Sequence, residues 1–384
     1  MDFSFSREEE TFRQEIREFL SREVTDELRH EAEAGAGWGP RTWEFVRKLG
    51  ARRWLTPTWP EEYGGLGLPP IYRFIIHEEL NYYNALPNEA LVVGAGVAGP
   101  TIMMYGTEEQ KKEYLPKISR GEIEFAIGYT EPQAGSDLAG LQMRADEKDD
   151  HYLLSGQKVY NTRCHYSQYH WLAVRTDPNA PRHRGISLMI VDLKSPGITI
   201  SPLWTVEGLR TNEVFYDNVR VPKENLVGEK NRGFIYTMTA LEFERVLSAG
   251  GLKRTLELLV DYVKTEPSLR DNTEVRQKLS QLATEIEIAR ILAYRLACLQ
   301  AKRQVATYEA SATKLFASEL SQRMAVAGMQ ILGLRGLLRS GMNGAPVDGR
   351  IEYLCRETLL NTIAGGTSEV MRNVIATRGL ELPR

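Results

Sequence analysis

The chain has 384 residues, of which 42% are hydrophobic and 26% charged, and its formal net charge is −3 at pH 7. This composition is ordinary for a globular protein, and the balanced charge gives no reason to expect nucleic acid or an acidic membrane surface as a partner. The longest apolar stretch, residues 90–105, is glycine-rich and too short to span a bilayer, so no membrane span is expected. A secretory signal begins with basic residues followed by an apolar run, whereas the first ten residues of this chain include several acids. A cytoplasmic location is therefore predicted. Three scattered cysteines indicate neither a disulfide framework nor a metal site.

Residues 1–120 are predicted to form a helical domain. Ser6 followed by Glu9 matches a capping box at a helix start. Apolar side chains then recur on one helical face, at Phe12, Ile16 and Leu20. Residues 56–70 are too rich in proline and glycine for a helix and are predicted to be a loop.

Residues 121–232 are predicted to be β structure. Clusters of turn-forming residues, such as those at 177–181 and 194–197, separate short apolar or alternating runs. These runs lie at 171–174, 186–191, 198–200 and 214–216. Their close spacing favours a small barrel or sandwich over a parallel sheet with crossover helices.

Residues 233–384 are again predicted to be helical. One face of a long helix is traced by apolar side chains, at Leu279, Leu282, Ile286, Ala289, Ala293 and Leu296. Long amphipathic helices with a polar back are typical of a bundle that also packs against a second subunit. The sequence therefore predicts an α+β protein with a helical domain, a middle β-barrel or sandwich and a helical bundle.

The most informative segment is residues 128–140, GYTEPQAGSDLAG, which follows a short apolar stretch. Its three glycines let the backbone approach a ligand, and successive amides in a turn form a concave surface of hydrogen-bond donors. An ordinary Gly/Pro/Ser loop is the alternative on composition alone. The order of residues closely resembles the first signature of the acyl-CoA dehydrogenase flavoproteins, in which this loop lies against the flavin and the thioester.

The resemblance to acyl-CoA dehydrogenases extends essentially end to end. The helical, β and helical order is the family's layout, and further family landmarks are similar at residues 59–67, 106–122, 156–162, 215–233 and 365–383. The form looks most like actinobacterial-type members that act on bulky acyl groups. The resemblance implies FAD as cofactor, an acyl-CoA thioester as substrate and an electron-transfer flavoprotein as electron acceptor. It also implies a homotetramer, or a heterotetramer with a related subunit.

Four residues are carried over from the family to the flavin ring. Tyr129 and Thr130 match positions whose backbone and hydroxyl face the ring. Thr162 matches the hydroxyl donor near the flavin N5, and Tyr160 stands where the family usually places an aromatic ring. Without the motif, a threonine in a predicted strand is more often a solvent-facing β-former than a flavin donor.

Further positions match the rest of the cofactor. Gly135 and Ser136 match residues along the ribityl and phosphate side, and Ser136 is also expected to bind substrate. In the carboxy-terminal domain, the element that normally covers the adenine is only partly kept, at Gln330, Gly333 and Gly336. Thr367 and Glu369 keep their places and are also expected to bind the cofactor. The family's Arg-x-x-Phe-Gly segment, which reaches the diphosphate across a dimer, has no counterpart in residues 265–275.

The catalytic base departs from the commonest family pattern. Many members carry it as a glutamate in the last signature, where this chain has Gly365. The isovaleryl-CoA and long-chain acyl-CoA dehydrogenases place the base just before an arginine on the first long helix of the third domain. Glu244 and Arg245 match that pair, so Glu244 is predicted to be the base and Arg245 to lie at the substrate. Glu242 is the competitor, but it is two residues away and therefore points about 200° around a helix.

The implied reaction is FAD-dependent α,β-dehydrogenation of an acyl-CoA thioester. A base outside the loop leaves volume beside the α-carbon, which favours a branched, alicyclic or steroid-side-chain acyl group. Two alternatives stay open. One is a non-catalytic or half-site subunit of a heteromeric acyl-CoA dehydrogenase, and the other is a flavin oxidase or monooxygenase on the same fold.

Overall fold

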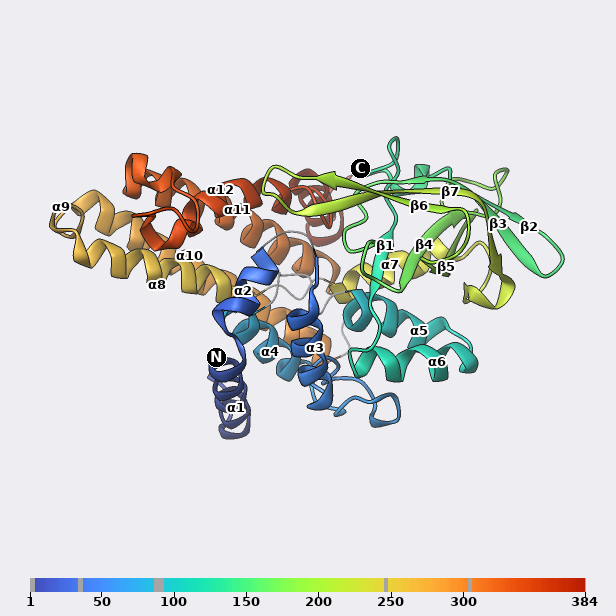
Figure 1. Cartoon of the computed structure of the whole chain (residues 1–384), viewed down its shortest axis with the longest axis horizontal. Coiled ribbons are helices and arrows are strands. Elements are labelled where there is room, and N and C mark those ends of the chain that lie inside the picture. The colour runs from blue at the N-terminus through green and yellow to red at the C-terminus, as the bar shows by residue number, and fades with distance from the viewer. Residues whose placement is uncertain (1–3, 34–36, 86–92, 245–247, 303–305, 384) are drawn as a thin grey trace. The chain divides into compact units, whose positions relative to one another are not determined.

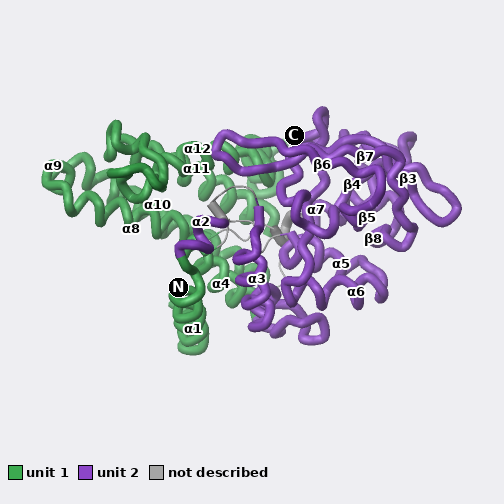
Figure 2. Tube along the Cα trace, viewed as in Figure 1, with its two compact units in different colours: residues 1–25, 69–85, 245–384 green, residues 26–68, 86–244 purple. Residues whose placement is uncertain are grey.

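The structure is a computed structural model that describes residues 4–33, 37–85, 93–244, 248–302 and 306–383, without the side chains at 32–33 and 241–244. Contacts divide the chain into two compact units (Figure 2). Unit 1 comprises residues 1–25, 69–85 and 245–384, and unit 2 comprises residues 26–68 and 86–244. The domain boundaries expected after residues 120 and 232 stay predictions.

Unit 2 contains an eight-stranded sheet within its described residues (Figure 1). Seven strands follow the order β6-β7-β3-β2-β4-β5-β8, and β1 pairs with β4 in parallel. β2 also meets β4 in parallel, whereas the other pairs are antiparallel. The strands are β1 (Phe125–Gly128), β2 (Arg144–Glu147), β3 (His151–Lys158), β4 (Tyr169–Arg175), β5 (Ile186–Asp192), β6 (Ile198–Trp204), β7 (Arg210–Pro222) and β8 (Leu226–Val227). The predicted apolar runs lie within β4 to β7.

Strands β4 and β5 are buried on both faces because their alternate residues enter two different cores. Trp171 and Ile190 lie in a core shared with helices α5 (Gly99–Tyr105), α6 (Glu108–Ser119) and α7 (Gly233–Glu244). Leu172 and Met189 enter a second core with apolar residues of β2, β3 and β7. A strand covered on both faces reads as a continuous apolar run, as these two do. Unit 2 also holds α2 (Asp26–Glu33) and α3 (Pro40–Ala51).

Unit 1 is helical in its described part. Its helices are α1 (Arg7–Glu23), α4 (Pro70–Tyr82), α8 (Gly250–Thr265), α9 (Pro267–Arg270), α10 (Thr273–Ala301), α11 (Thr307–Leu332), α12 (Arg350–Asn361) and α13 (Ser368–Val374). The predicted capping box is present, since Ser6 Oγ accepts from the Glu9 amide and the Glu9 carboxylate accepts from the Ser6 amide. Five of the six apolar positions predicted for α10 are buried, and Leu279 is partly buried against the same cores. The predicted α+β class with helical, β and helical regions is confirmed.

Short helical turns connect these elements. They are η1 (Glu61–Tyr63), η2 (Gly94–Ala98), η3 (Leu138–Gly140), η4 (Lys223–Asn225), η5 (Gly333–Leu337), η6 (Pro346–Gly349) and η7 (Ile375–Gly379). η1 lies inside the predicted loop at residues 56–70, and α4 begins at its last residue.

A buried carboxylate joins α1 to α4 within unit 1. Glu79 of α4 has a side chain that is 1% exposed, and it accepts from Arg13 Nε at 2.6 Å and from Arg17 Nε at 2.9 Å. Both arginines belong to α1 and are themselves partly buried. The carboxylate is therefore neutralised by two guanidinium groups from the neighbouring helix.

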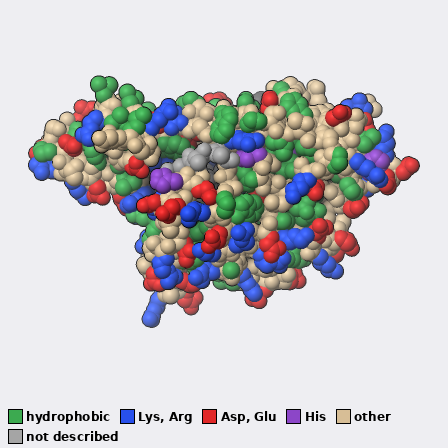
Figure 3. All heavy atoms as spheres, viewed as in Figure 1, with side chains coloured by type: hydrophobic (Ala, Val, Ile, Leu, Met, Phe, Trp, Pro, Cys, Tyr) green, Lys and Arg blue, Asp and Glu red, His purple; other side chains and the backbone are tan. Residues whose placement is uncertain are grey.

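The surface carries both signs of charge. Lysine and arginine side chains are interspersed with aspartate and glutamate on the face shown in Figure 3, as the small net charge suggests. Within the described residues, no helix combines the length and the apolar character that crossing a membrane requires.

Candidate functional site

The predicted ligand loop leaves the end of β1 and folds into a tight turn. The amide and carbonyl of Glu131 pair with the carbonyl and amide of Ala134, each at 3.0 Å. Tyr129 is buried just before the turn, while Gly135 and Ser136, which follow it, are exposed. A Cβ added to Gly135 would meet no atom within 4 Å. The backbone that follows the turn therefore offers an open surface to a ligand.

The segment after β3 lies directly beside this loop. The Val159 amide donates to the Thr130 carbonyl at 3.0 Å, and the Asn161 side-chain amide donates to the Ile127 carbonyl at 3.1 Å. These bonds bring the 129–130 and 160–162 segments together in unit 2. Four of the predicted flavin residues are thus neighbours in space, although more than 25 residues separate the two segments in the sequence.

The side chains of the second segment suit a planar ring. Tyr160 has a left-handed φ of 56°, and the residue is 65% exposed, which is unusual for a large aromatic residue. Thr162 is half-buried and its hydroxyl donates to the Thr211 hydroxyl at 3.3 Å. An exposed aromatic face beside a hydroxyl and an open glycine turn fits an isoalloxazine ring and its ribityl chain.

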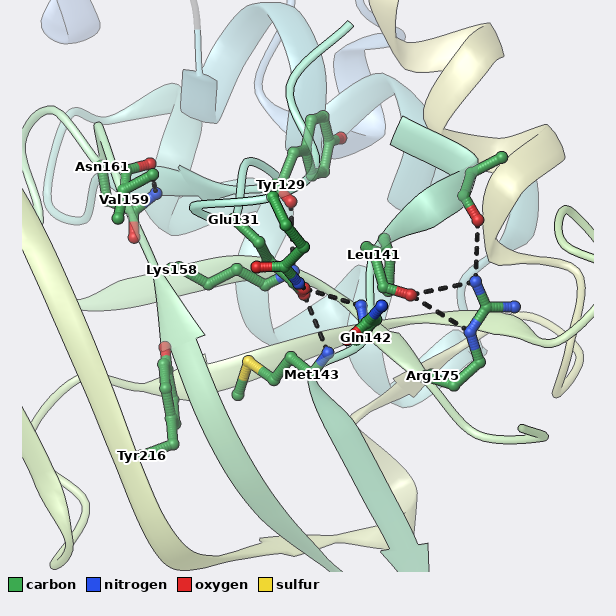
Figure 4. A network of polar contacts seen from close by, with 12 residues as sticks. Tyr129, Glu131, Leu141, Gln142, Met143, Lys158, Val159, Asn161, Arg175 and Tyr216 are labelled. Carbon is green, nitrogen blue, oxygen red and sulfur yellow. Dashed lines mark hydrogen bonds and ion pairs between the residues drawn. The ribbon is translucent and has the colours of Figure 1, made fainter. Parts of the chain in front are cut away.

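A buried ion pair lies beneath the loop (Figure 4). Lys158, the last residue of β3, is fully buried and its Nζ lies 2.8 Å from Glu131 Oε1. Burial lowers the pKa of Lys158 to about 8, against the opposing effect of the Glu131 carboxylate. Both residues stand in motifs that the sequence singles out, but nothing in the sequence indicates that they meet.

A second buried carboxylate precedes β1. Glu124 Oε1 accepts from the Gly94 amide at 2.8 Å and from the Phe125 amide at 2.9 Å. Burial raises the pKa of Glu124 to about 6, and the guanidinium of Arg163 partly offsets that rise. This group was not predicted from the sequence, because glutamate is usually a surface residue.

The raised pKa of Glu124 predicts a pH dependence of stability. Its folded pKa of about 6 exceeds the unfolded value of 4.5, so its contribution is fully present below pH 4.5 and is lost as pH rises through 6. The free energy of unfolding should fall by about 2 kcal/mol across this window from this group alone. Urea unfolding from pH 4 to 7.5 should show this fall in the parent and a flatter profile in Glu124→Gln. Parallel profiles would contradict the assignment.

Unit 1 contains a groove of about 770 Å³ between α10, α11 and the start of α13. Three of the four cofactor-binding residues predicted in the carboxy-terminal domain line it: Gln330, Thr367 and Glu369. Thr367 caps α13, since its hydroxyl accepts from the Val370 amide at 3.2 Å. Gly333, the fourth, ends α11 with a left-handed φ of 57° and is not among the lining residues.

The charges in this groove are balanced. Its lining includes three cations and three carboxylates, at Lys278, Arg323, Arg372, Glu285, Glu319 and Glu369. Arg323 lies 2.8 Å from Glu285, and Arg372 lies 2.6 Å from Glu319. The polar lining and the volume fit an adenosine, whereas the paired arginines give a diphosphate less charge than an unpaired arginine would.

The predicted base lies at the end of α7. A Cβ on Gly233 would come within 2.4 Å of the Ser187 backbone, so only glycine lets α7 begin directly against β5. Glu244 is the last residue of α7, and its side chain lies outside the described residues. Arg245 lies outside them altogether.

Gly365 takes the left-handed conformation at the position where many relatives carry the base. Its φ is 65°, and a Cβ built on it would meet no atom within 4 Å. The neighbouring Gly366 carbonyl accepts from Lys314 Nζ at 2.5 Å. The loop thus leaves open space at Gly365 in unit 1.

Known proteins of one family match this chain over nearly its whole length. Models of the acyl-CoA dehydrogenase N-terminal, middle and C-terminal domains match residues 6–122, 126–219 and 231–380. The acyl-CoA dehydrogenase FadE26 of Mycobacterium tuberculosis is 35% identical, over 100% of this chain and 99% of its own length. The solved Tcur3481-Tcur3483 steroid ACAD is 36% identical with a TM-score of 0.92, covering 100% of both chains. The ChsE4-ChsE5 complex from M. tuberculosis has the same coverage and TM-score at 34% identity.

Proposed function

Because this chain belongs to the acyl-CoA dehydrogenase family and is an oxidoreductase acting on acyl-CoA, we propose that it performs the FAD-dependent α,β-dehydrogenation of a bulky acyl-CoA thioester. The electrons pass to an electron-transfer flavoprotein, and the enzyme works in the cytoplasm. The observation that carries the proposal is the Val159–Thr130 backbone bond. It sets Tyr129 and Thr130 beside Tyr160 and Thr162, in one surface of backbone, hydroxyl and aromatic groups.

The proposed chemistry divides between two kinds of groups. Glu244 removes the proton from the substrate α-carbon and holds it on its carboxylate. Backbone amides of the loop and the Thr130 hydroxyl provide donors near the thioester and the ring, where negative charge develops on the carbonyl oxygen. The exposed ring of Tyr160 shields this region from water. Bound FAD would supply the hydride acceptor for the β-carbon.

Two observations support a bulky acyl group. This chain has Gly365 where many relatives carry a glutamate, and the space beside it is open, since a Cβ there would have no neighbour within 4 Å. A solved relative with 36% identity is described as a steroid ACAD. A branched, alicyclic or steroid-side-chain thioester is therefore the proposed substrate class.

The groove in unit 1 supports shared cofactor sites between subunits. Gln330, Thr367 and Glu369 are proposed to contact the adenosine end of FAD, with Gly333 nearby at the end of α11. Since Arg323, Arg372 and Lys278 are already paired with carboxylates, the diphosphate would need a cation from elsewhere. A related subunit could supply it, and the ChsE4-ChsE5 complex shows that relatives of this chain form heteromeric assemblies. We propose a tetramer, formed with copies of this chain or with a related subunit.

The same observations favour a second candidate, a half-site subunit that completes a partner's site without catalysing the reaction. The missing diphosphate arginine and Gly365 both fit such a subunit. An oxidase on this fold is distinguished by the product, because it would release hydrogen peroxide in air.

The absorbance spectrum of the purified chain tests these proposals. We expect a yellow protein whose flavin bands bleach under anaerobic conditions with branched, alicyclic or steroid-side-chain acyl-CoA, and much more slowly with straight-chain thioesters. Equal bleaching by all thioesters would refute the substrate class. A colourless chain that gains flavin only with a related subunit would favour the half-site alternative, and stoichiometric peroxide would favour the oxidase.

A further inference from the structure

The buried ion pair beneath the loop has no part in the chemistry proposed above. Each oxygen of the Glu131 carboxylate accepts two hydrogen bonds from neighbouring groups. Oε1 accepts from Lys158 Nζ at 2.8 Å and from the Met143 amide at 2.9 Å. Oε2 accepts from the Gln142 amide at 2.6 Å and from the Gln133 side chain at 2.7 Å. Glu131 is 3% exposed and Lys158 is 0% exposed.

The pair is tied to both segments that carry predicted flavin residues. Lys158 Nζ also donates to the Tyr129 carbonyl at 3.1 Å, and the next residue, Val159, donates its amide to Thr130. Figure 4 shows the lysine extending from β3 towards the Glu131 carboxylate and the Tyr129 carbonyl. A single ammonium group thus joins the end of β3 to both ends of a three-residue stretch of the loop.

Stability alone does not explain such a pair. Removing two charges from water costs several kcal/mol per ion, and apolar residues of similar volume often replace a buried ion pair without loss of stability. Directional bonds to four different chain positions do something that apolar packing cannot, because they permit one arrangement of the segments and penalise others. The bonds converge on the loop at Tyr129 and Glu131, beside the segment that carries Tyr160.

We propose that Glu131 and Lys158 are positioning residues that fix the separation between the backbones at 129–130 and 160–162, and so set the width of the flavin-binding surface. The flavin enters this inference through the proposed function, whereas the fixed separation does not depend on it. The two residues act through the backbone they hold and are not catalytic. Loss of the pair should let the two segments move apart, even in a protein that remains as stable as the parent.

Two variants and a control separate positioning from stability. Lys158→Met removes the donor and leaves Glu131 buried without its counter-charge. The double variant Glu131→Gln/Lys158→Met removes both charges and should regain most of the thermal stability. Tyr216→Phe is the control, because it removes a buried hydroxyl of the same sheet that bonds His170 rather than the loop.

Hydrogen–deuterium exchange is measured on protein freed of flavin, in peptides covering 127–143 and 156–163. We expect both Lys158 variants to exchange at least about tenfold faster than the parent in these two peptides and at the parental rate elsewhere. FAD affinity should fall by about tenfold or more in the double variant, although its melting temperature is close to the parent's. Tyr216→Phe should lower the melting temperature and leave both peptides and the FAD affinity unchanged.

A double variant with parental exchange in both peptides would overturn the proposal, as would equal acceleration in the Tyr216→Phe control. If the parent binds no FAD, the proposed function fails, but the exchange comparison still decides whether the pair fixes the two segments. If the parent binds FAD and the double variant exchanges rapidly yet binds FAD with parental affinity, the pair does not set the width of the flavin-binding surface.

Discussion

Replacing Glu244 by glutamine is expected to leave FAD bound and to slow acyl-CoA-dependent flavin bleaching on the order of 1,000-fold. The amide has nearly the shape of the carboxylate but cannot take the α-proton, so binding should survive while proton removal fails. Anaerobic stopped-flow absorbance with a bulky acyl-CoA measures the rate, and flavin content per chain measures cofactor binding. Full activity in Glu244→Gln would refute its assignment as the base.

Glu242→Gln is the matched control. Glu242 and Glu244 both belong to α7. Side chains two positions apart on a helix point about 200° away from each other, so only one of these two faces any given site. We expect Glu242→Gln to bleach at close to the parental rate. A loss confined to Glu242→Gln would transfer the role to that residue.

Replacing Glu79 by alanine is expected to lower the free energy of unfolding by about 3 kcal/mol. The change leaves Arg13 and Arg17 facing each other in a partly buried site where a carboxylate with 1% exposure had neutralised both. Equilibrium urea unfolding followed by circular dichroism measures the loss. An unfolding free energy within 0.5 kcal/mol of the parent, about what a surface substitution causes, would contradict the role given to this carboxylate.

Glu10→Ala is the control for the loss of one negative charge beside Arg13, because Glu10 also belongs to α1. Glu10 lies 3.5 Å from Arg13 but its side chain is 43% exposed. Exposed ion pairs of this kind contribute between about 0 and 1 kcal/mol. The control should therefore unfold at nearly the parental denaturant concentration, and a loss as large as that of Glu79→Ala would show that burial is not the cause.

Much of the fold is predictable because it follows local periodicity. The apolar positions at every third or fourth residue of α10 are the ones that its helix buries, and Ser6 and Glu9 cap α1 as their spacing predicts. The continuous apolar runs of β4 and β5 predict strands. Only the structure shows that alternate side chains of each run enter two separate cores.

The candidate site is less predictable because it depends on long-range pairing. The motifs indicate Tyr129, Thr130 and Thr162 through family resemblance, and the structure places the two segments side by side. The bond between Glu131 and Lys158 spans 27 residues and requires the end of β3 to lie under the loop. Glu124 is similar, because its surroundings come from Gly94, 30 residues earlier. Neither partner can be found from local spacing.

The division of the chain into units has a consequence for its synthesis. Unit 2 is complete once residue 244 has left the ribosome, so it can fold while the rest of the chain is still being made. Helices α1 and α4 belong to unit 1, and α4 packs against α8 and α10, which are translated much later. Until then α4 exposes apolar side chains, including Phe74 and Ile75, that are 1% exposed in the finished protein. The nascent chain should therefore depend on chaperones most strongly between the emergence of α4 and that of α10.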